Sequence, residues 1–271
     1  MIVPMLSPHP EGVRPRLTDA LANPPGEFPG KKVLDAELDD LADQTEVLQA
    51  ALGAEQRRSL LVILQGRDAC GKDGTTRRVF RKCNPALCVV TNFKVPNALE
   101  LRHDYLWRVH QAVPPRGMFG IFNRSHYEDV LPVRVHGLVP ERVWRKRFDQ
   151  INAFEAMLSD EGVVIRKFFL HISKEEQRKR LEERLDDPAK NWKFSPGDIG
   201  ERVLWDKYTE AYEDILELTS PARNPWYIVP ADRNRARDLM VAQVVLQALQ
   251  EMNPSYPPAD PAVLALRGTI V

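Results

Sequence analysis

A phosphate-type loop between an aliphatic run and a helix is the feature that most restricts how this chain can fold. Residues 60–64 form a continuous aliphatic run that predicts a buried strand, and residues 66–72 then match the pattern GxxxxGK. In that context, backbone N–H groups and the start of the next helix surround phosphate groups, and Lys72 adds a positive charge. The motif predicts a phosphate site in a parallel α/β fold; the alternative is a plain strand-to-helix turn.

Strands and helices are predicted to alternate along the chain. Further strands are expected at residues 87–93, 118–122, 163–172 and 226–229. Helices are expected at residues 33–52, 75–82, 99–113, 140–158, 174–185, 201–218 and 236–252, with another helical region starting near His126. This order predicts a parallel sheet of about five strands, covered by helices on both faces, with ligands at the carboxyl ends of the strands.

Two proline-rich segments flank this region. Residues 4–29 predict an extended arm, the helix at 33–52 is expected to end at Gly53, and prolines recur after Asn253. We therefore divide the chain into an arm with a docking helix (1–55), a core with a lid at about 174–200 (56–252) and a tail (253–271).

Composition excludes several classes of protein. A formal net charge of +0 argues against coating nucleic acid through an overall basic field, and no specific nucleic-acid motif is present. The brief apolar start, residues 1–6, is interrupted by Pro4, and no stretch predicts a membrane span. The three cysteines form no CxxC pair, which fits a reducing compartment. We expect a cytoplasmic protein.

Two carboxylates stand in or next to the phosphate loop. Asp68 lies inside it, and Asp73 follows Lys72, where the standard loop has Ser or Thr. Like unit charges about 4 Å apart repel by about 4 kcal/mol at an effective dielectric constant of 20, so a cation must separate these acids from phosphate. We expect Asp68 to help hold Mg²⁺, with Asp73 as a second ligand or an orienting group; the alternative for Asp73 is an acid favoured in a helix's first turn.

Several long motifs, in order, resemble the polyphosphate kinase 2 family. They read GRDACGKDGT, FNRSHYEDVL, RVHGLVPE, FFLHISKEEQRKRLEERLDDPAKNWKFSPGD and PWYIVPAD, and the likeness runs from about residue 60 to about 249. The resemblance implies a P-loop kinase fold that uses inorganic polyphosphate to phosphorylate nucleotides. The HYEDV form is similar to the branch that acts on AMP as well as ADP; adenine nucleotides are the expected acceptors, with guanine as a second option.

The resemblance also implies roles for individual residues. It assigns catalysis to Asp68, Lys72, Asp73, Arg124 and Glu128. Because this chain departs from the family at Asn123, we expect the metal, Mg²⁺ with Mn²⁺ as a second option, at Asp68 and Glu128. Contacts to phosphate are expected from Gly71, Lys72, Gly74, Thr75, Arg77, Arg78, Arg81, Asn123 and Arg134. Asn123 stands where many members have Asp, and Arg67 and Cys70 replace residues more often apolar or small.

Each of these roles has a purely structural alternative. The basic residues after the loop could form a solvated helix face, and Arg124 could make a structural salt bridge to Glu128 or Asp129. His126 is interpreted as structural or substrate-positioning, because no triad partner is evident.

The segment at 174–200 is predicted to be a mobile lid. It combines basic residues, among them Arg178, Arg184 and Lys193, with aromatic residues and turn formers; the alternative is an ordinary connecting loop. The expected partners are polyphosphate and nucleotides, and a homo-oligomer is expected from the family. Two competing functions stay open: an ATP-dependent nucleotide or nucleoside kinase, and a non-catalytic polyanion-binding module.

Overall fold

The computed structural model describes residues 3–269, and its centre is a five-stranded parallel sheet with strand order β2-β3-β1-β4-β5. The strands are β1 (Ser59–Gln65), β2 (Cys88–Asn92), β3 (Phe119–Asn123), β4 (Val163–His171) and β5 (Trp226–Pro230). In the pairing of β1 with β3, Leu64 lies opposite Asn123, so the carboxyl ends of these two strands coincide. The predicted α/β fold with a parallel sheet is confirmed.

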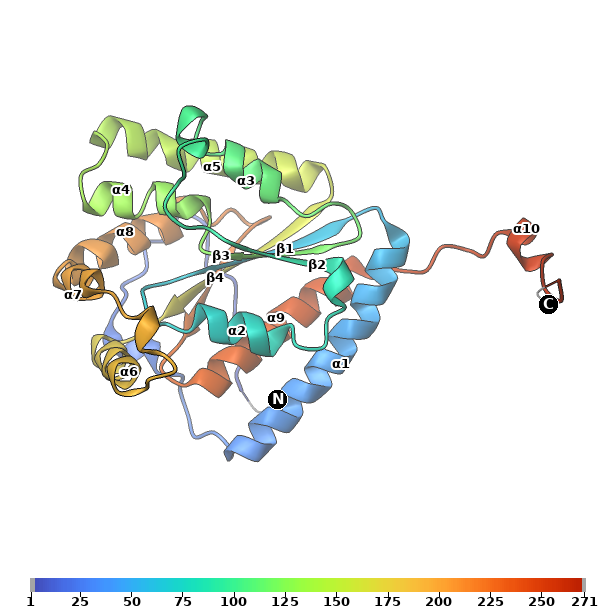
Figure 1. Cartoon of the computed structure of the whole chain (residues 1–271), viewed down its shortest axis with the longest axis horizontal. Helices are drawn as coiled ribbons and strands as arrows, with labels where there is room; N and C mark the ends of the chain where they lie inside the picture. The colour runs from blue at the N-terminus through green and yellow to red at the C-terminus, as the bar shows by residue number, and fades with distance from the viewer. Residues whose placement is uncertain (1–2, 270–271) are drawn as a thin grey trace.

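Helices cover both faces of the sheet (Figure 1). One face carries α1 (Lys31–Glu55), α2 (Lys72–Val79) and α9 (Asn234–Met252). The other carries α3 (Trp107–Ala112), α4 (Pro132–Val135), α5 (Glu141–Asp160) and α8 (Trp205–Leu218). The segment of α6 (Lys174–Asp186), η5 (Asn191–Lys193) and α7 (Pro196–Val203) lies at the carboxyl end of the sheet.

Strand β1 shows why its sequence is aliphatic throughout. All seven of its residues are buried, and because side chains alternate along a strand, Leu60, Val62 and Leu64 join the core under α1 and α9. Leu61 and Ile63 join the core under α5 and α8. Full burial of such a side chain contributes about 1.5–3 kcal/mol, so the sheet is anchored at the strand that carries the phosphate loop.

Several predicted helix boundaries are wrong; the helix predicted at 75–82, for example, is α2, which begins at Lys72 and ends at Val79. The helix expected at 99–113 is broken into η3 (Glu100–Arg102) and α3, because the Asn97 and Asp104 side chains accept hydrogen bonds from backbone N–H groups and compete with the helix. The helix expected near 201–218 is two helices, α7 and α8. Helix α1 continues through Gly53 to Glu55 and is capped by Gln56 at a φ of 51°.

The remaining elements are short. They are η1 (Asp19–Ala22), η2 (Pro85–Leu87), η4 (His126–Asp129) and α10 (Pro261–Leu264). The N-terminal segment follows the body: the His9 backbone N–H donates to the Trp226 carbonyl at 2.7 Å, and Arg14 pairs with Glu213 on α8 at 3.3 Å. The tail beyond Asn253 extends away from it (Figure 1). Of the apolar start, Met1 and Ile2 lie outside the described residues.

None of the helices within residues 3–269 has the length and apolar character needed to cross a bilayer.

Candidate active site

The phosphate loop joins β1 to α2 at the carboxyl edge of the sheet. Gly66 and Gly71 have φ of 151° and 104°; an added Cβ would lie 2.6 Å from the Leu170 carbonyl oxygen at Gly66 and 1.9 Å from Arg237 Nη1 at Gly71. Only glycine fits these two positions without a shift of the surroundings. The Lys72 ammonium donates to the Gly66 and Arg67 carbonyl oxygens at 2.7 and 3.1 Å. The tight turn thus places the Lys72 ammonium against the backbone carbonyls of the loop.

Side chains from distant helices bind the other loop carbonyls. Gln177 Nε2 of α6 donates to the Asp68 carbonyl at 2.9 Å. Arg180 Nη1 of α6 donates to the Ala69 and Cys70 carbonyls at 3.1 and 3.3 Å, and Arg237 Nη1 of α9 reaches the Cys70 carbonyl at 3.0 Å. Each carbonyl from position 66 to 70 therefore has a side-chain donor, which leaves no unpaired loop oxygen to repel an anion.

Sequence reasoning did not identify Gln177 or Arg237 as site residues, and it placed Arg180 only among the basic residues of the predicted lid. Their partners are more than 100 residues away in the chain, and the only local signal was the polar, basic composition of α6. Pairings of this kind depend on how the helices dock and not on a motif.

Asp68, Arg124 and Glu128 meet beside the loop. The Arg124 guanidinium donates to an Asp68 carboxylate oxygen and to Glu128 Oε2, the latter at 3.3 Å. Arg124 follows β3 directly with a φ of 62°, a conformation that is uncommon for non-glycine residues and is often found at functional sites. Burial alone would raise the pKa of Asp68, but Arg124 and Lys72 outweigh it and lower that pKa. Asp68 is therefore held ionised.

One structural alternative for Arg124 is partly realised. It does pair with Glu128, but its second partner is Asp68 and not Asp129, which pairs with Arg108 at 3.4 Å. The arginine thus contacts both carboxylates to which the metal role was assigned, so they converge on one point.

The donor set fits a hard divalent cation. Mg²⁺ is usually bound by one or two protein carboxylates together with substrate phosphates and water, and Asp68 and Glu128 supply two such groups. Within residues 3–269, no group of three or more His, Cys, Asp or Glu side chains could hold a metal by itself. Phosphotransferases generally require a divalent metal ion, and here its remaining ligands would have to come from substrate and water.

Asp73 connects the loop to the predicted lid. Its carboxylate accepts from Asn123 Nδ2 at 2.6 Å and pairs with Lys193 of η5 at 3.1 Å. Burial raises the pKa of Asp73, but the contacts with Asn123 and Lys193 outweigh that effect and lower it. Asp73 also lies in the first turn of α2, so its position is compatible with both the predicted orienting role and the helix-turn alternative.

Most of the other predicted phosphate ligands in and after α2 already have side-chain partners. Arg78 pairs with Asp35 of α1 at 2.6 Å and with buried Asp238, and Arg81 pairs with Asp39 of α1 at 2.6 Å. Thr75 Oγ1 donates to Asp238 at 2.9 Å. Arg77 is exposed on α2. Arg78 in α2 and Arg81 just beyond its end are therefore already paired with carboxylates in the free protein.

Some of the predicted site residues on other elements are also paired with carboxylates, whereas Arg184 lies near the site. Arg134 pairs with Asp214 of α8, and Arg178 pairs with Glu175 and Glu182 on the exposed side of α6. The Arg184 charge contributes to lowering the pKa of Asp68, which puts it within electrostatic reach of the site. His126 is buried and bonded to Glu155 at 3.1 Å, in agreement with a structural role.

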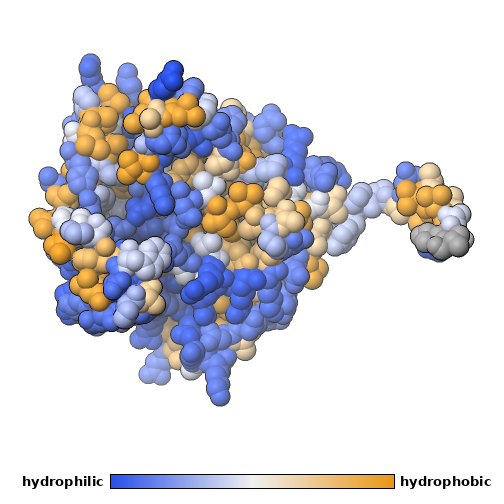
Figure 2. Space-filling model, viewed as in Figure 1, coloured by the Kyte–Doolittle hydropathy of each residue, from blue (hydrophilic) through white to orange (hydrophobic). Residues whose placement is uncertain are grey.

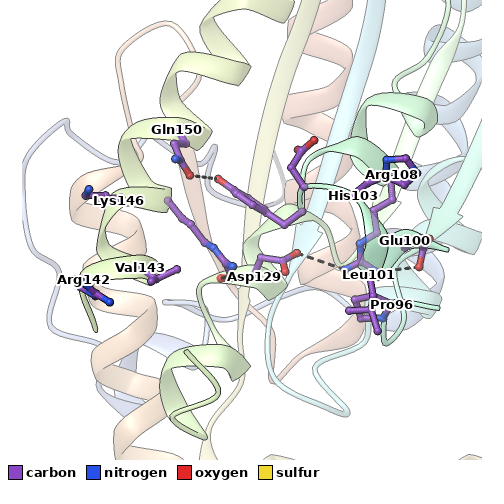
Figure 3. A pocket seen from close by; sticks show the side chains of 13 residues that line it. Pro96, Glu100, Leu101, His103, Arg108, Asp129, Arg142, Val143, Lys146 and Gln150 are labelled. Atoms are coloured by element: carbon purple, nitrogen blue, oxygen red, sulfur yellow. Dashed lines mark hydrogen bonds and ion pairs between the residues drawn. The ribbon is translucent and has the colours of Figure 1, made fainter. Parts of the chain in front are cut away.

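Figure 2 shows hydrophilic residues lining a hollow on the side of the molecule where α4, α6 and α7 lie. A separate pocket of about 620 Å³ lies between η3 and α5, and Asp129 is one of the residues that line it (Figure 3). There Arg108 binds both Asp129 and Glu100, and Tyr105 donates to Gln150 at 3.1 Å. Neighbours on η4 thus face different spaces: Glu128 faces Arg124, and Asp129 faces this pocket.

Comparison with known proteins identifies the family. The family model for polyphosphate kinase 2 matches residues 30–257. The chain is 52% identical to the AMP/ADP-polyphosphate phosphotransferase of Meiothermus ruber, covering 86% of this chain and 87% of that one. It is 47% identical to the ADP-polyphosphate phosphotransferase of Rhodopseudomonas palustris, covering 79% and 78%.

A solved structure agrees. The crystal structure of polyphosphate kinase 2 from Arthrobacter aurescens TC1 superposes with a TM-score of 0.87 at 38% identity and covers 99% of both chains. On this evidence, and with the phosphate loop and its acid–arginine cluster in place, the chain belongs to the polyphosphate kinase 2 family.

Proposed function

We propose that this enzyme transfers a phosphoryl group between inorganic polyphosphate and adenine nucleotides, converting AMP to ADP and ADP to ATP. The observation that carries the proposal is the single guanidinium of Arg124 held between Asp68 and Glu128, beside the lysine of the phosphate loop. The names of the two relatives, which act on AMP and ADP or on ADP, support the same substrates.

The proposed mechanism depends on positioning and charge. Phosphoryl transfer needs charge stabilisation more than covalent chemistry by the protein, and arginines are suited to the charge that spreads over the transferring group. Lys72 and the start of α2 would bind the phosphate chain, and Arg124 would exchange its carboxylate partners for the transferring phosphoryl group. Exchange is feasible because Arg124 is 36% exposed.

Asp68 and Glu128 would hold the metal ion, for which we propose Mg²⁺, with Mn²⁺ as a substitute. The metal would neutralise charge on the phosphates when bound. Asp68 is ready for this role because Arg124 and Lys72 keep its pKa low against the effect of burial. Asp73 would orient Asn123 and Lys193 instead of binding the metal itself.

The segment of α6, η5 and α7 would close over the substrates as a lid. Lys193 already reaches Asp73 across the loop, and Arg184 lies within electrostatic reach of Asp68. With Arg77 and Arg124, these cations would line a path for a long polyanion, whose binding should weaken as salt rises. Arg78, Arg81 and Arg134 would join it by leaving their carboxylates.

Four finer points belong to the proposal and rest on the family resemblance and on composition: guanine nucleotides as secondary acceptors, assembly into a homo-oligomer, a cytoplasmic location, and the division of the chain at residues 55 and 252.

The test is a donor assay. Purified protein is incubated with polyphosphate, Mg²⁺ and either AMP or ADP, without ATP, and the nucleotides are separated by ion-exchange chromatography. Formation of ADP or ATP supports the proposal. Product that requires ATP as donor would favour the ATP-dependent kinase, and absence of any turnover would favour a binding module.

A further inference from the structure

Arg67, the second residue of the phosphate loop, is buried against α8. Its side chain lies over the Trp205 indole with the guanidinium carbon 3.9 Å from the ring centroid. Its Nη2 donates to the Trp205 carbonyl at 3.1 Å and to Thr209 Oγ1 at 2.5 Å. Because Trp205 is the first residue of α8, just beyond α7, this contact ties the loop to the root of the predicted lid.

Unlike Arg237, the other buried arginine next to the loop, Arg67 has no carboxylate in direct contact among the described residues. The acids that act on it, Asp19 and Asp206, lie farther away. Within residues 3–269, no carboxylate lies within 4.0 Å of its guanidinium, and its buried Nε has no hydrogen-bond partner. Arg237, which is equally enclosed, pairs with Asp238 at 2.8 Å. A buried cation without a paired anion is costly in the free protein, and the cost falls when an anion binds nearby.

We infer that Arg67 is a positioning residue whose counter-charge is the phosphate chain bound at the loop, and whose contact with Trp205 couples that loop to the lid. The backbone of Arg67 belongs to the phosphate loop: the residue comes one position before Asp68, and its carbonyl accepts from Lys72 Nζ at 3.1 Å. The side chain that contacts α8 is therefore attached to the part of the chain that would surround the phosphate. The inference rests on the proposed phosphate substrate.

The coupling has a thermodynamic consequence that a purely structural arginine would not have. A ligand that binds only the folded protein raises its stability in proportion to the logarithm of its concentration over its dissociation constant. If the ligand also supplies the missing counter-charge, removing the Arg67 charge should weaken the ligand's effect while sparing the free protein, which no longer buries an unpaired cation.

The experiment compares Arg67→Met, which keeps bulk without charge, with Arg67→Lys, which keeps the charge. Thermal unfolding is measured with and without inorganic tripolyphosphate, and KM and kcat are measured with polyphosphate and ADP. Arg58→Met is the matched control: this arginine pairs with Glu55 at 2.8 Å beside the amino end of β1, away from the loop.

We expect the Met variant to lose at least half of the rise in Tm caused by tripolyphosphate and to raise KM for polyphosphate by roughly tenfold, equivalent to about 1.4 kcal/mol of binding energy. The Lys variant should recover part of both. The control should lower Tm in buffer and keep the full tripolyphosphate effect.

An unchanged tripolyphosphate effect in Arg67→Met would overturn the inference, as would equal losses in the Met and Lys variants. If the Met variant does not fold, Arg67→Gln replaces it in the comparison with Lys. Failure of the proposed function is separable, because it would appear as absent turnover of polyphosphate by the unaltered protein.

Discussion

Two clusters of opposite charges lie close to the sheet and differ in how far solvent reaches them. In the first, Lys167 of β4 and Glu155 of α5 are 0% exposed and pair at 2.6 Å. The lysine also donates to the Thr219 carbonyl at 2.6 Å and to the Tyr127 hydroxyl at 3.1 Å, so all three of its protons are used. In the second, Arg124 and Asp68 are 36% and 30% exposed.

This difference in exposure indicates which cluster has a structural role and which can take part in the reaction. A fully bonded buried pair cannot exchange partners without leaving a bare charge in the core, which costs several kcal/mol. A pair that is about one third exposed can exchange a carboxylate for a phosphate at little cost, because solvent screens the intermediate arrangement. The first cluster should therefore fix the position of α5 on the sheet, and the second should carry the reaction.

The largest expected effect is on turnover. Arg124→Ala should lower kcat by roughly 10³-fold, because an arginine on the transferring phosphoryl group contributes of that order. Its Tm should change little, since the side chain is a third exposed. Steady-state assay with polyphosphate and ADP measures the loss, and Arg145→Ala, an exposed arginine paired with Glu141, is the control. A fall in kcat of less than about tenfold would remove Arg124 from the transition state.

The next effect is on stability. Glu155→Gln should lower the free energy of unfolding by about 3 kcal/mol, because it leaves Lys167 buried without its counter-charge. Urea unfolding measures the change, with Glu161→Gln, an exposed partner of Arg116, as the control. A change below about 1 kcal/mol would show that the buried pair does not anchor α5.

Asp68→Asn should impair the magnesium dependence of the reaction and leave stability nearly unchanged, the opposite of Glu155→Gln. Because the carboxylate is proposed to hold the metal, the magnesium concentration at half-maximal rate should rise by at least about tenfold, equivalent to about 1.4 kcal/mol of metal binding. The urea unfolding curve should stay close to that of the unaltered protein. A normal magnesium dependence would exclude Asp68 from the metal site.

The buried cluster also predicts a pH dependence of stability. Burial raises the pKa of Glu155, but Lys167 and His126 outweigh it and lower that pKa below its ordinary value. The stabilisation is therefore complete above the ordinary pKa of about 4.3 and is lost as pH falls through the lower folded value. The difference in unfolding free energy between the unaltered protein and Glu155→Gln should shrink below about pH 4 in urea titrations.

The smallest effect concerns the lid. Lys193→Ala removes a partly exposed pair with Asp73, and exposed pairs contribute about 0–1 kcal/mol, so KM for polyphosphate should rise about two- to threefold. Lys190→Ala, on the same segment but paired with Asp187, is the control. Equal KM values for the two variants would contradict a contact between lid and loop in the reaction.

The sequence predicted the sheet and the central cluster because both depend on local patterns. The aliphatic run of β1 and the polar run after β3 each mark a strand end, and parallel pairing then brings Asp68 and Arg124 together. The pairings of Arg78 and Arg81 with α1 were not predictable, because they depend on how two helices dock. For the same reason no motif predicted the contacts of Arg180 with the loop carbonyls, or the burial of Arg67 against α8 without a paired carboxylate.

The measurement that tests the central claim most directly is ³¹P NMR of the protein with polyphosphate, ADP and Mg²⁺ and no ATP, run beside Arg124→Ala. The account predicts that ATP resonances grow as terminal polyphosphate is consumed, and that the variant shows almost none over the same period. Equal rates in the two samples, or no ATP in either, would contradict it.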